Sequence, residues 1–394
     1  MTHKVFVAGV GMIPFKKPGT SDTYDVMGAN AVRQALADAG VDYRDVQQAY
    51  AGYVYGDSTC GQKALYHVGM SGIPVLNVNN NCATGSSALF LARQAVQSGA
   101  VECALAVGFE YMQPGALKSV WTDRARSLER AAHLTNELVD RPDLPGAIRQ
   151  FSGAGRAHMQ KYGTRLETFA RIRAKASRHA AHNPLAVFRN VMTPEDVLAA
   201  PALWDGVMTR PMACPPTCGA AAAVVVSEAF ARRHNLRTDV RIAGQALTTD
   251  TPSTYDARDM IRVVGFDMTR AAATQAYEQA GIGPADVDVV ELHDCFAQNE
   301  LLSYEGLGLC PEGEGEKLVD DGDNTYGGRW VVNPSGGLLS KGHPLGATGL
   351  AQCYELTHQL RGTAEARQVE NARVALAHNV GLGGACVVTL FTAA

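Results

Sequence analysis

The chain has 394 residues, 46% hydrophobic and 19% charged, a globular composition in a chain too long for one ordinary core. The formal net charge of -4 gives no reason to expect nucleic acid, and no run of about twenty apolar residues could span a bilayer. The start lacks the segments of a signal peptide and the end lacks a peroxisomal Ser-Lys-Leu address, so we expect a cytoplasmic protein.

Three pairs of segments match one another in the same order along the chain. They are residues 5–9 and 240–244, residues 31–41 and 272–282, and residues 82–85 and 346–349. The first pair has the pattern of a strand, the second that of a helix closed by glycine, and the third opens an apolar-periodic helix. Such an ordered repeat indicates duplication. We therefore expect an α/β protein of two similar halves, with mixed, mostly parallel sheets covered by helices.

The repeat also predicts domain boundaries. We assign residues 1–118 together with 208–239 to the N-terminal half and residues 240–394 to the C-terminal half. Residues 119–207 match neither half, are richer in charge, and are expected to form an inserted loop domain over the core. The insertion is expected to carry a basic patch made of Arg171, Arg173, Lys175, Arg178 and His179.

Nine cysteines are scattered along the chain, and only Cys214 and Cys218 form a close pair. No second pair stands at zinc spacing, and a disulfide scaffold is not typical of a long cytosolic chain, so we expect no metal and no disulfide. Most of these cysteines should be small buried residues.

Cys82 stands between the polar residues 77–81 and the start of a helix. Unpaired N–H groups and the positive end of the helix dipole lower the pKa of a thiol there and can receive an oxyanion. The segment therefore predicts a nucleophilic cysteine, with a packed structural cysteine at a turn as the alternative.

His343 lies in a glycine-rich loop, residues 336–349, next to Pro344 and just before the second helix of that repeat. A histidine in this place can activate a thiol or donate to a developing oxyanion. The alternative is a phosphate-binding loop with an incidental histidine, although the glycine spacing is neither that of a dinucleotide-binding turn nor that of a P-loop.

Two further polar segments follow expected strands: His293, Asp294 and Cys295 after residues 289–292, and His378, Asn379 and Gly381 after residues 374–377. The carboxyl ends of strands are where α/β sheets place active groups. Taken singly, the first segment fits a buried His–Asp hydrogen bond and the second a tight turn. Their correspondence in two related halves favours one shared active site.

These segments resemble those of thiolases, specifically the sterol-carrier-protein-X type, also called lipid-transfer-protein-like thiolases. The resemblance spans nearly the whole chain and is carried by residues 52–61, 79–82, 293–296, 322–328 and 342–344 and by the late glycine loop. It implies the thiolase fold, two duplicated α/β halves in a five-layered α-β-α-β-α core with an inserted loop domain. Family members are homodimers or homotetramers.

The resemblance also implies roles for the residues that match. Cys82 matches the acylated nucleophile, and His343 matches the histidine that activates it and helps bind the thioester oxygen. The backbone N–H groups of Cys82 and Gly381 match the second oxyanion site. Ordinary thiolases have asparagine where this chain has His293, which we count among the catalytic residues.

Ordinary thiolases place a second cysteine where this chain has Asn379, and in this subfamily Cys295 is thought to supply that acid/base thiol. We count Asp294, Asn379 and His378 among the active-site loops. The inserted domain matches the one that covers CoA in the family, which makes Arg178 and His179 candidates for its phosphate or adenine.

The resemblance thus implies thiolytic cleavage of 3-oxoacyl-CoA by CoA, which is a substrate, with no tightly bound cofactor. One alternative is a thiolase-fold aldolase or condensing subunit with a partner protein; relatives with that chemistry have lost the nucleophile, whereas Cys82 is retained. A second alternative is a non-catalytic acyl-CoA- or lipid-binding protein, but the small lipid-carrying domain is usually a C-terminal extension and the chain is expected to end before it.

Overall fold

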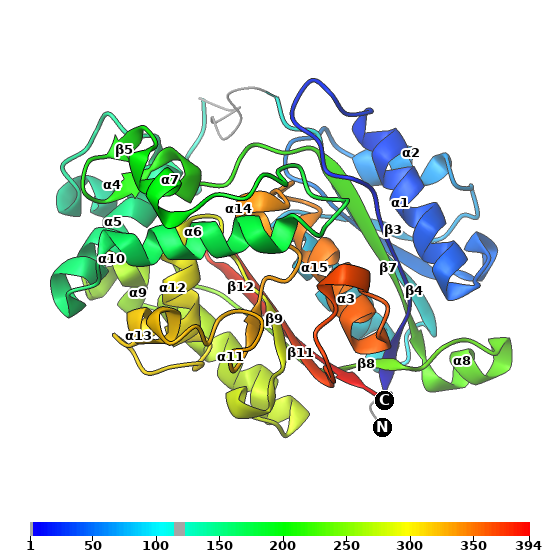
Figure 1. The fold of residues 1–394 in the computed structure, drawn as a ribbon. Helices are drawn as coiled ribbons and strands as arrows, with labels where there is room; N and C mark the ends of the chain where they lie inside the picture. Colours follow the sequence, from blue (N-terminus) through cyan, green and yellow to red (C-terminus); the bar gives the residue numbers. More distant parts are fainter. Residues whose placement is uncertain (1–2, 114–122) are drawn as a thin grey trace.

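The computed structural model describes residues 3–113 and 123–394 (Figure 1). The boundary expected between residues 118 and 119 lies outside the described residues. The predicted division into two halves and an insertion therefore stays a prediction. Among the described residues, no helix combines the length and the apolar character that crossing a membrane requires.

Ten strands form the central sheet, five from each half of the chain. The strands of the first half are β1 (Val5–Met12), β2 (Gln48–Gly52), β3 (Val75–Val78), β4 (Cys103–Glu110) and β7 (Gly219–Ser227). Those of the second half are β8 (Val240–Thr248), β9 (Val289–Glu291), β10 (Val331–Val332), β11 (Val374–Gly381) and β12 (Ala385–Ala393). A separate hairpin pairs β5 (Ala202–Trp204) with β6 (Met208–Thr209).

The order of strands bears the duplication out. It runs β10-β9-β11-β12-β8-β1-β7-β4-β2-β3, so each half has the same sequence of strands outward from the junction of β8 and β1. The two halves join there through the single pair Phe6–Arg241. The sheet is mixed, as expected, but not mostly parallel: β7 and β12 each run antiparallel to both neighbours, because each returns the chain to the middle of its own half.

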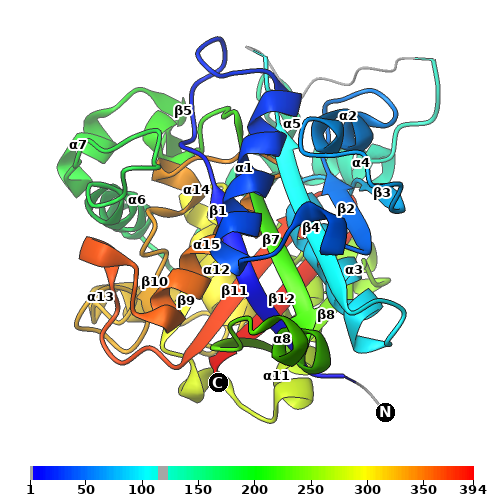
Figure 2. The ribbon, with the colours of Figure 1, turned by 90° about the vertical axis from the view of Figure 1, so that its right-hand side faces the viewer.

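Helices complete five layers, as the fold prediction required (Figures 1 and 2). The related helices α3 (Thr84–Gln97) and α15 (Thr348–Arg361) pack on each other in the middle, between the strands of the two halves. The helix α1 (Tyr24–Ala39), with α2 (Cys60–Tyr66), covers the outer face of the first half, and α11 (Phe266–Ala280) covers that of the second.

The two central helices approach closely at their N-termini. A Cβ atom on Gly85 would lie 2.7 Å from the backbone oxygen of Gly346, so only glycine fits at position 85. Each of these helices begins at the threonine of its repeated Ala-Thr-Gly segment, Thr84 in α3 and Thr348 in α15. The duplicated sequence therefore brings the loop before α3 and the loop before α15 to the same place.

The remaining helices lie between residues 129 and 340. They are α4 (Glu129–Leu138), α5 (Gly146–Tyr162), α6 (Leu166–Ala180), α7 (Pro194–Ala199), α8 (Glu228–His234), α9 (Ser253–Asp256), α10 (Met260–Val263), α12 (Ala297–Gly306), α13 (Gly315–Asp320) and α14 (Gly337–Ser340). Short 3-10 turns lie at η1 (Tyr43–Asp45), η2 (Arg210–Met212), η3 (Pro284–Asp286) and η4 (Glu365–Arg367).

The prediction of a basic surface patch on α6 is wrong. Arg173 is buried and donates to the Ser340 hydroxyl over 2.7 Å, and Lys175 is buried in an ion pair with Glu300. Among the five residues of the predicted patch, Arg178 is exposed to solvent. The reason is that α6 packs against α7, α12, α13 and α14, so most of its circumference faces protein.

Candidate active site

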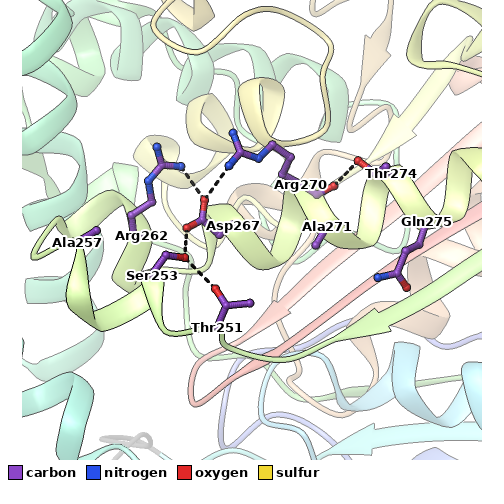
Figure 3. Close-up of a pocket in the computed structure, with 9 residues that line it drawn as sticks. All are labelled: Thr251, Ser253, Ala257, Arg262, Asp267, Arg270, Ala271, Thr274 and Gln275. Atoms are coloured by element: carbon purple, nitrogen blue, oxygen red, sulfur yellow. Dashed lines mark hydrogen bonds and ion pairs between the residues drawn. The ribbon is translucent and has the colours of Figure 1, made fainter.

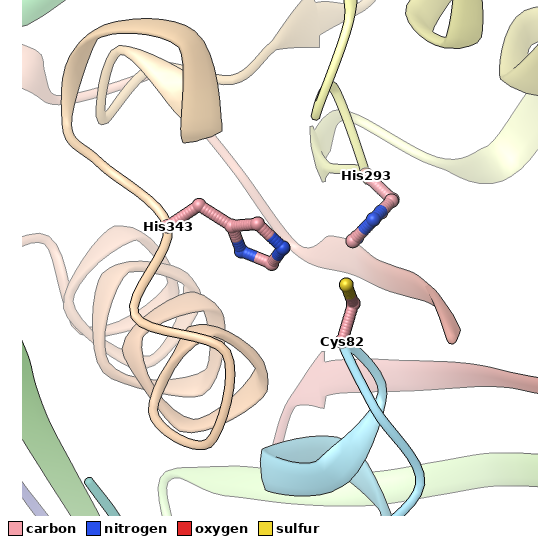
Figure 4. Close-up of side chains that lie close together, drawn as sticks. All are labelled: Cys82, His293 and His343. Atoms are coloured by element: carbon pink, nitrogen blue, oxygen red, sulfur yellow. The ribbon is translucent and has the colours of Figure 1, made fainter. Parts of the chain in front are cut away.

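Three of the predicted residues meet at the N-terminal ends of the two central helices. Cys82 stands two residues before α3, His343 five residues before α15, and His293 just after β9. Figure 4 shows their side chains pointing toward one another. The Cys82 sulfur and one ring nitrogen of each histidine lie within 4.8 Å of one another. We call these three residues the Cys–His–His cluster.

The ring of His343 is held so that one nitrogen is free. Its Nδ1 lies 2.7 Å from the Thr348 hydroxyl, and that hydroxyl donates to the backbone oxygen of Pro344 over 2.9 Å. The Thr348 hydroxyl uses its one proton to donate to Pro344, so it can only accept from Nδ1–H of His343. Nε2 of His343 therefore carries a lone pair and no proton. Nε2 is buried with no hydrogen-bond partner in the described part of the chain. Burial holds the pKa of His343 well below its usual value, so the ring is neutral.

His293 is oriented by a chain of amides. Its Nδ1 lies 3.0 Å from Oδ1 of Asn379, while the Asn379 amide nitrogen donates to the Ser86 hydroxyl over 3.0 Å and to the side chain of Gln352. The amide nitrogen of Gln352 in turn donates to the His378 backbone oxygen, which fixes the direction of the whole chain. The proton of His293 is therefore on Nδ1, and burial lowers its pKa to about 4.

The Cys82 thiol is not the preformed thiolate that its position before a helix favoured. Burial, with a smaller contribution from the negative charge of Glu110, raises its pKa to about 12. Desolvation outweighs the helix end here because charge is disfavoured wherever water is excluded. A base must therefore remove the proton as Cys82 attacks, and Nε2 of His343 is a free acceptor in the cluster.

Glu110 also joins the two halves mechanically. Its carboxylate accepts from the N–H groups of Val54, Tyr55 and Gly346, at 3.1, 2.9 and 3.0 Å. Burial raises the pKa of Glu110 to about 7. This carboxylate therefore ties the end of β4 to the loop that carries His343.

Cys295 is buried near the cluster, with its pKa well above the usual value. Burial is the main cause, and negative charge on Cys214 or Cys82 would add to the rise. Its high pKa keeps Cys295 protonated, the form that can donate a proton. Cys386 is buried elsewhere, with its sulfur 3.7 Å from the Thr269 hydroxyl.

Cys214 was missed as a site residue, because its spacing from Cys218 was examined only for zinc. Its N–H donates to the backbone oxygen of Cys295 over 2.9 Å. Three residues on, the Thr217 hydroxyl accepts from the N–H of His343 over 3.2 Å. Residues 213–217 therefore connect the Cys295 loop to the His343 loop through hydrogen bonds. No sequence pattern indicates this connection.

Gly381 lies against the loop that carries Cys82. A Cβ atom there would lie 2.1 Å from the backbone oxygen of Asn80, so this position takes only glycine. The Asn81 amide donates to the backbone oxygen of Leu382 over 2.8 Å, which locks the two loops together. The N–H groups of Cys82 and Gly381 thus belong to adjoining loops, as a shared oxyanion site would need.

Asp294 supports the site from behind. Its buried carboxylate accepts from the N–H groups of Leu338 and Leu339 over 2.7 and 3.3 Å, at the start of α14. Burial raises the pKa of Asp294 to about 8. Since α14 leads directly into the loop of His343, Asp294 positions that loop instead of facing the cluster.

Three predicted residues are not brought into the cluster. The His378 ring bonds to the Thr269 hydroxyl over 3.0 Å, so it is directed at α11. His179 is buried, and its two ring nitrogens bond to the backbone oxygen of Asn333 and the hydroxyl of Thr325. The third, Arg178, is exposed on α6.

A separate surface pocket of about 720 Å³ contains none of the predicted residues (Figure 3). Arg262 and Arg270 both bond to Asp267 there, and Asp267 also accepts from the Ser253 hydroxyl. Its charges are satisfied by one another, so the pocket shows no unpaired group for chemistry.

Two family profiles match the chain: the thiolase N-terminal domain over residues 5–146 and the thiolase C-terminal domain-like family over residues 248–392. The chain belongs to the thiolase family. Within that family it is related to the sterol carrier protein 2 and lipid-transfer-protein-like branch, as its sequence relatives show.

Three such relatives illustrate the relationship. Rabbit (Oryctolagus cuniculus) sterol carrier protein 2 is 53% identical over 98% of this chain and 72% of its own length. Non-specific lipid-transfer protein-like 2 of Caenorhabditis elegans is 46% identical over 98% of this chain and 96% of its own. The benzoylsuccinyl-CoA thiolase subunit BbsB of Thauera aromatica is 36% identical over 97% and 96%.

Solved structures agree on the fold. An Ltp2-ChsH2(DUF35) aldolase has a TM-score of 0.84 at 23% identity, covering 100% of this chain and 98% of that one. Human mitochondrial 3-ketoacyl-CoA thiolase in complex with CoA has a TM-score of 0.74 at 20% identity, covering 100% and 98%. At these identities the likeness speaks for the fold alone.

Proposed function

We propose that the protein is an acyltransferase that cleaves 3-oxoacyl-CoA with CoA through an acyl thioester on Cys82. The products are a shortened acyl-CoA and acetyl-CoA, or propionyl-CoA from 2-methyl substrates, in fatty acid or sterol side-chain degradation. The observation that carries the proposal is the convergence of the Cys82 sulfur and two imidazole nitrogens within 4.8 Å. A neutral imidazole beside a thiol is the arrangement that nucleophilic catalysis requires.

The first half-reaction follows from the protons in the cluster. Nε2 of His343 takes the proton of Cys82 as the sulfur attacks carbon 3 of the substrate. The C2–C3 bond then breaks, leaving an acyl thioester on Cys82 and an enolate of acetyl-CoA. The proton now on Nε2 makes His343 a donor to the enolate oxygen, so one residue serves first as base and then as oxyanion donor.

In the proposed site, His293 acts as a hydrogen-bond acceptor. While its proton is on Nδ1 and bonded to Asn379, its Nε2 can only accept. In this proposal the His293 ring accepts a hydrogen bond from a water or from the substrate and so positions it. The ring does not donate a hydrogen bond itself. The second oxyanion site is formed by the N–H groups of Cys82 and Gly381.

Cys295 completes the cycle. Its thiol gives a proton to carbon 2 of the enolate, and the resulting thiolate takes the thiol proton of the incoming CoA. The CoA sulfur then attacks the acyl thioester and releases the shortened acyl-CoA, and the departing Cys82 thiolate takes back the proton from Nε2 of His343. The high pKa of Cys295 suits this role, because it makes the thiol the resting form and its anion a strong base.

For CoA itself, exposed Arg178 is kept as a candidate phosphate contact. His179 is not, because both its ring nitrogens are used inside the protein. The expected cytoplasmic location and the absence of a tightly bound cofactor remain part of the proposal.

A homodimer is also part of the proposal, with the edge strand β3 at its interface. β3 ends the sheet and pairs only with β2 in the described structure. Exposed apolar side chains lie on β3 and on elements close to it in the chain: Leu76 on β3, Tyr66 at the end of α2, Met70 between α2 and β3, and Val26 on α1. An unpaired edge flanked by apolar residues is usually covered, here by a second copy.

The experiment that tests the acyl-enzyme is intact-protein and peptide mass spectrometry after brief exposure to a panel of 3-oxoacyl-CoAs without CoA. The expected result is one acyl group on Cys82, none in Cys82→Ala, and an unchanged adduct in the remote variant Cys310→Ala. Consumption of the 3-oxoacyl-CoA without a thioester on Cys82 would contradict the proposal, and cleavage of a 3-hydroxyacyl-CoA in its place would favour aldolase chemistry, which needs no such sulfur.

A further inference from the structure

The Cys–His–His cluster has the chemistry of a zinc ligand set. Thiolate sulfur and imidazole nitrogen are the ligands that Zn²⁺ prefers, and three protein ligands with one open position form a common zinc site. Among the described residues, Cys82, His293 and His343 are a group whose ligand atoms all lie within 4.8 Å of one another. Sequence spacing predicted no metal because the three come from separate segments.

The protons of the two histidines are placed as metal ligation requires. A metal-binding histidine donates its other ring N–H to a protein acceptor, which fixes the tautomer. His343 does so toward Thr348 and His293 toward Asn379. Within residues 3–113 and 123–394, Nε2 of His343 is moreover buried without a hydrogen-bond partner, so its lone pair is available to an ion.

The geometry is close to that of a tetrahedral site. Bonds of about 2.0–2.3 Å to zinc place ligand atoms roughly 3.3–3.8 Å apart, so the cluster needs to contract by about 1 Å. Rotation of the short Cys82 side chain can supply part of this. The two rings stand at 81° with centroids 5.1 Å apart, so their nitrogens can approach one ion from different directions. Cys82 is only half-buried, which gives an ion access.

We propose that Cys82, His293 and His343 bind one thiophilic divalent cation, of which Zn²⁺ is the type, and that the bound ion blocks Cys82. On binding, the Cys82 thiol loses its proton to solvent and the sulfur becomes a ligand, while the neutral histidines lose none. The ordinary asparagine at the position of His293 would remove one of the three ligands, so the site is a property of this chain's histidine.

The test uses Co²⁺ alone as a spectroscopic probe of the full-length, metal-free protein, without any acyl-CoA. We expect one Co²⁺ per chain, with a sulfur-to-cobalt charge-transfer band and the intense visible bands of tetrahedral coordination, displaced by Zn²⁺. Calorimetry in buffers of different ionisation enthalpy should give about one proton released per Zn²⁺. Bound Zn²⁺ should protect Cys82 from iodoacetamide, and a chelator should restore its reaction.

Matched variants decide the ligands. The charge-transfer band should vanish in Cys82→Ala, and affinity should fall at least about tenfold in His293→Asn but stay unchanged in the exposed-site variant His182→Asn. Should His293→Asn misfold, Asn379→Ala removes the acceptor that holds His293 and should also weaken binding about tenfold. Octahedral spectra without the sulfur band, or equal affinity in His293→Asn and His182→Asn, would overturn the proposal. Because no substrate is present, either result is independent of whether Cys82 is acylated.

Discussion

The side-chain oxygen of Asn379 accepts a hydrogen bond from Nδ1 of His293 over 3.0 Å. By the resemblance to thiolases, Asn379 matches the position of their second cysteine and His293 that of their asparagine. The structure shows that these two positions contact each other, with the Asn379 amide orienting the His293 imidazole. We propose that the second thiol is supplied by Cys295, two residues after His293.

Replacement of Cys295 by alanine tests this relocation. We expect turnover with CoA to fall by about two to four orders of magnitude, since general acid–base catalysis is lost. Acylation of Cys82 in a single turnover should still be detectable. The matched variant Cys386→Ala removes a buried thiol outside the cluster and should keep its turnover within a few fold. A fully active Cys295→Ala together with an inactive Cys386→Ala would assign the second thiol to Cys386.

Removal of the Thr348 hydroxyl tests the tautomer of His343. In Thr348→Val, Nδ1 of His343 loses its acceptor, so the ring proton can move to Nε2. In that tautomer Nε2 cannot accept the proton of Cys82. We expect kcat to fall at least about tenfold with KM little changed, and the pH profile of kcat to shift. Thr348→Ser keeps the hydroxyl and should restore most of the activity. Equal losses in the two variants would point to packing instead of proton placement.

The pH dependence of Cys82 alkylation tests its resting state. With its pKa raised to about 12, the thiol is protonated through neutral pH, and the reactive thiolate increases as pH rises. The rate of iodoacetamide labelling, followed on the Cys82 peptide, should therefore rise about tenfold per pH unit from pH 7 to 9. Labelling that is fast and independent of pH over that range would reveal a preformed thiolate pair with His343.

A charge on the edge strand tests the dimer. Leu76, on β3, and Leu198, on α7, are similarly exposed, at 40% and 37%. In Leu76→Glu the charge would be buried against the second copy, so we expect the sedimenting mass to fall by half. Leu198→Glu should sediment like the wild type. A monomeric wild type, or unaltered association in Leu76→Glu, would contradict an interface at β3.

The amino-acid sequence by itself determined the duplicated α/β architecture and the segments of the site. Both follow from local patterns: apolar periodicity, helix-ending glycines such as Gly40 and Gly281, and polar residues directly after strands. The repeated Ala-Thr-Gly segment also marked where α3 and α15 begin. Such signals are readable because neighbouring residues decide them.

The tertiary structure alone decided the electrostatics and the partners. The sequence predicted a basic patch in this part of the chain, but the burial of α6 could not be predicted from it, so the expectation of a surface patch that includes Arg173 and Lys175 was wrong. The helix start just after Cys82 suggested a low pKa for its thiol, while desolvation by the surrounding chain raises that pKa. The contacts of His293 with Asn379 and of Cys214 with Cys295 join residues far apart in the sequence. They depend on which distant segments pack together away from water, and no local pattern encodes that.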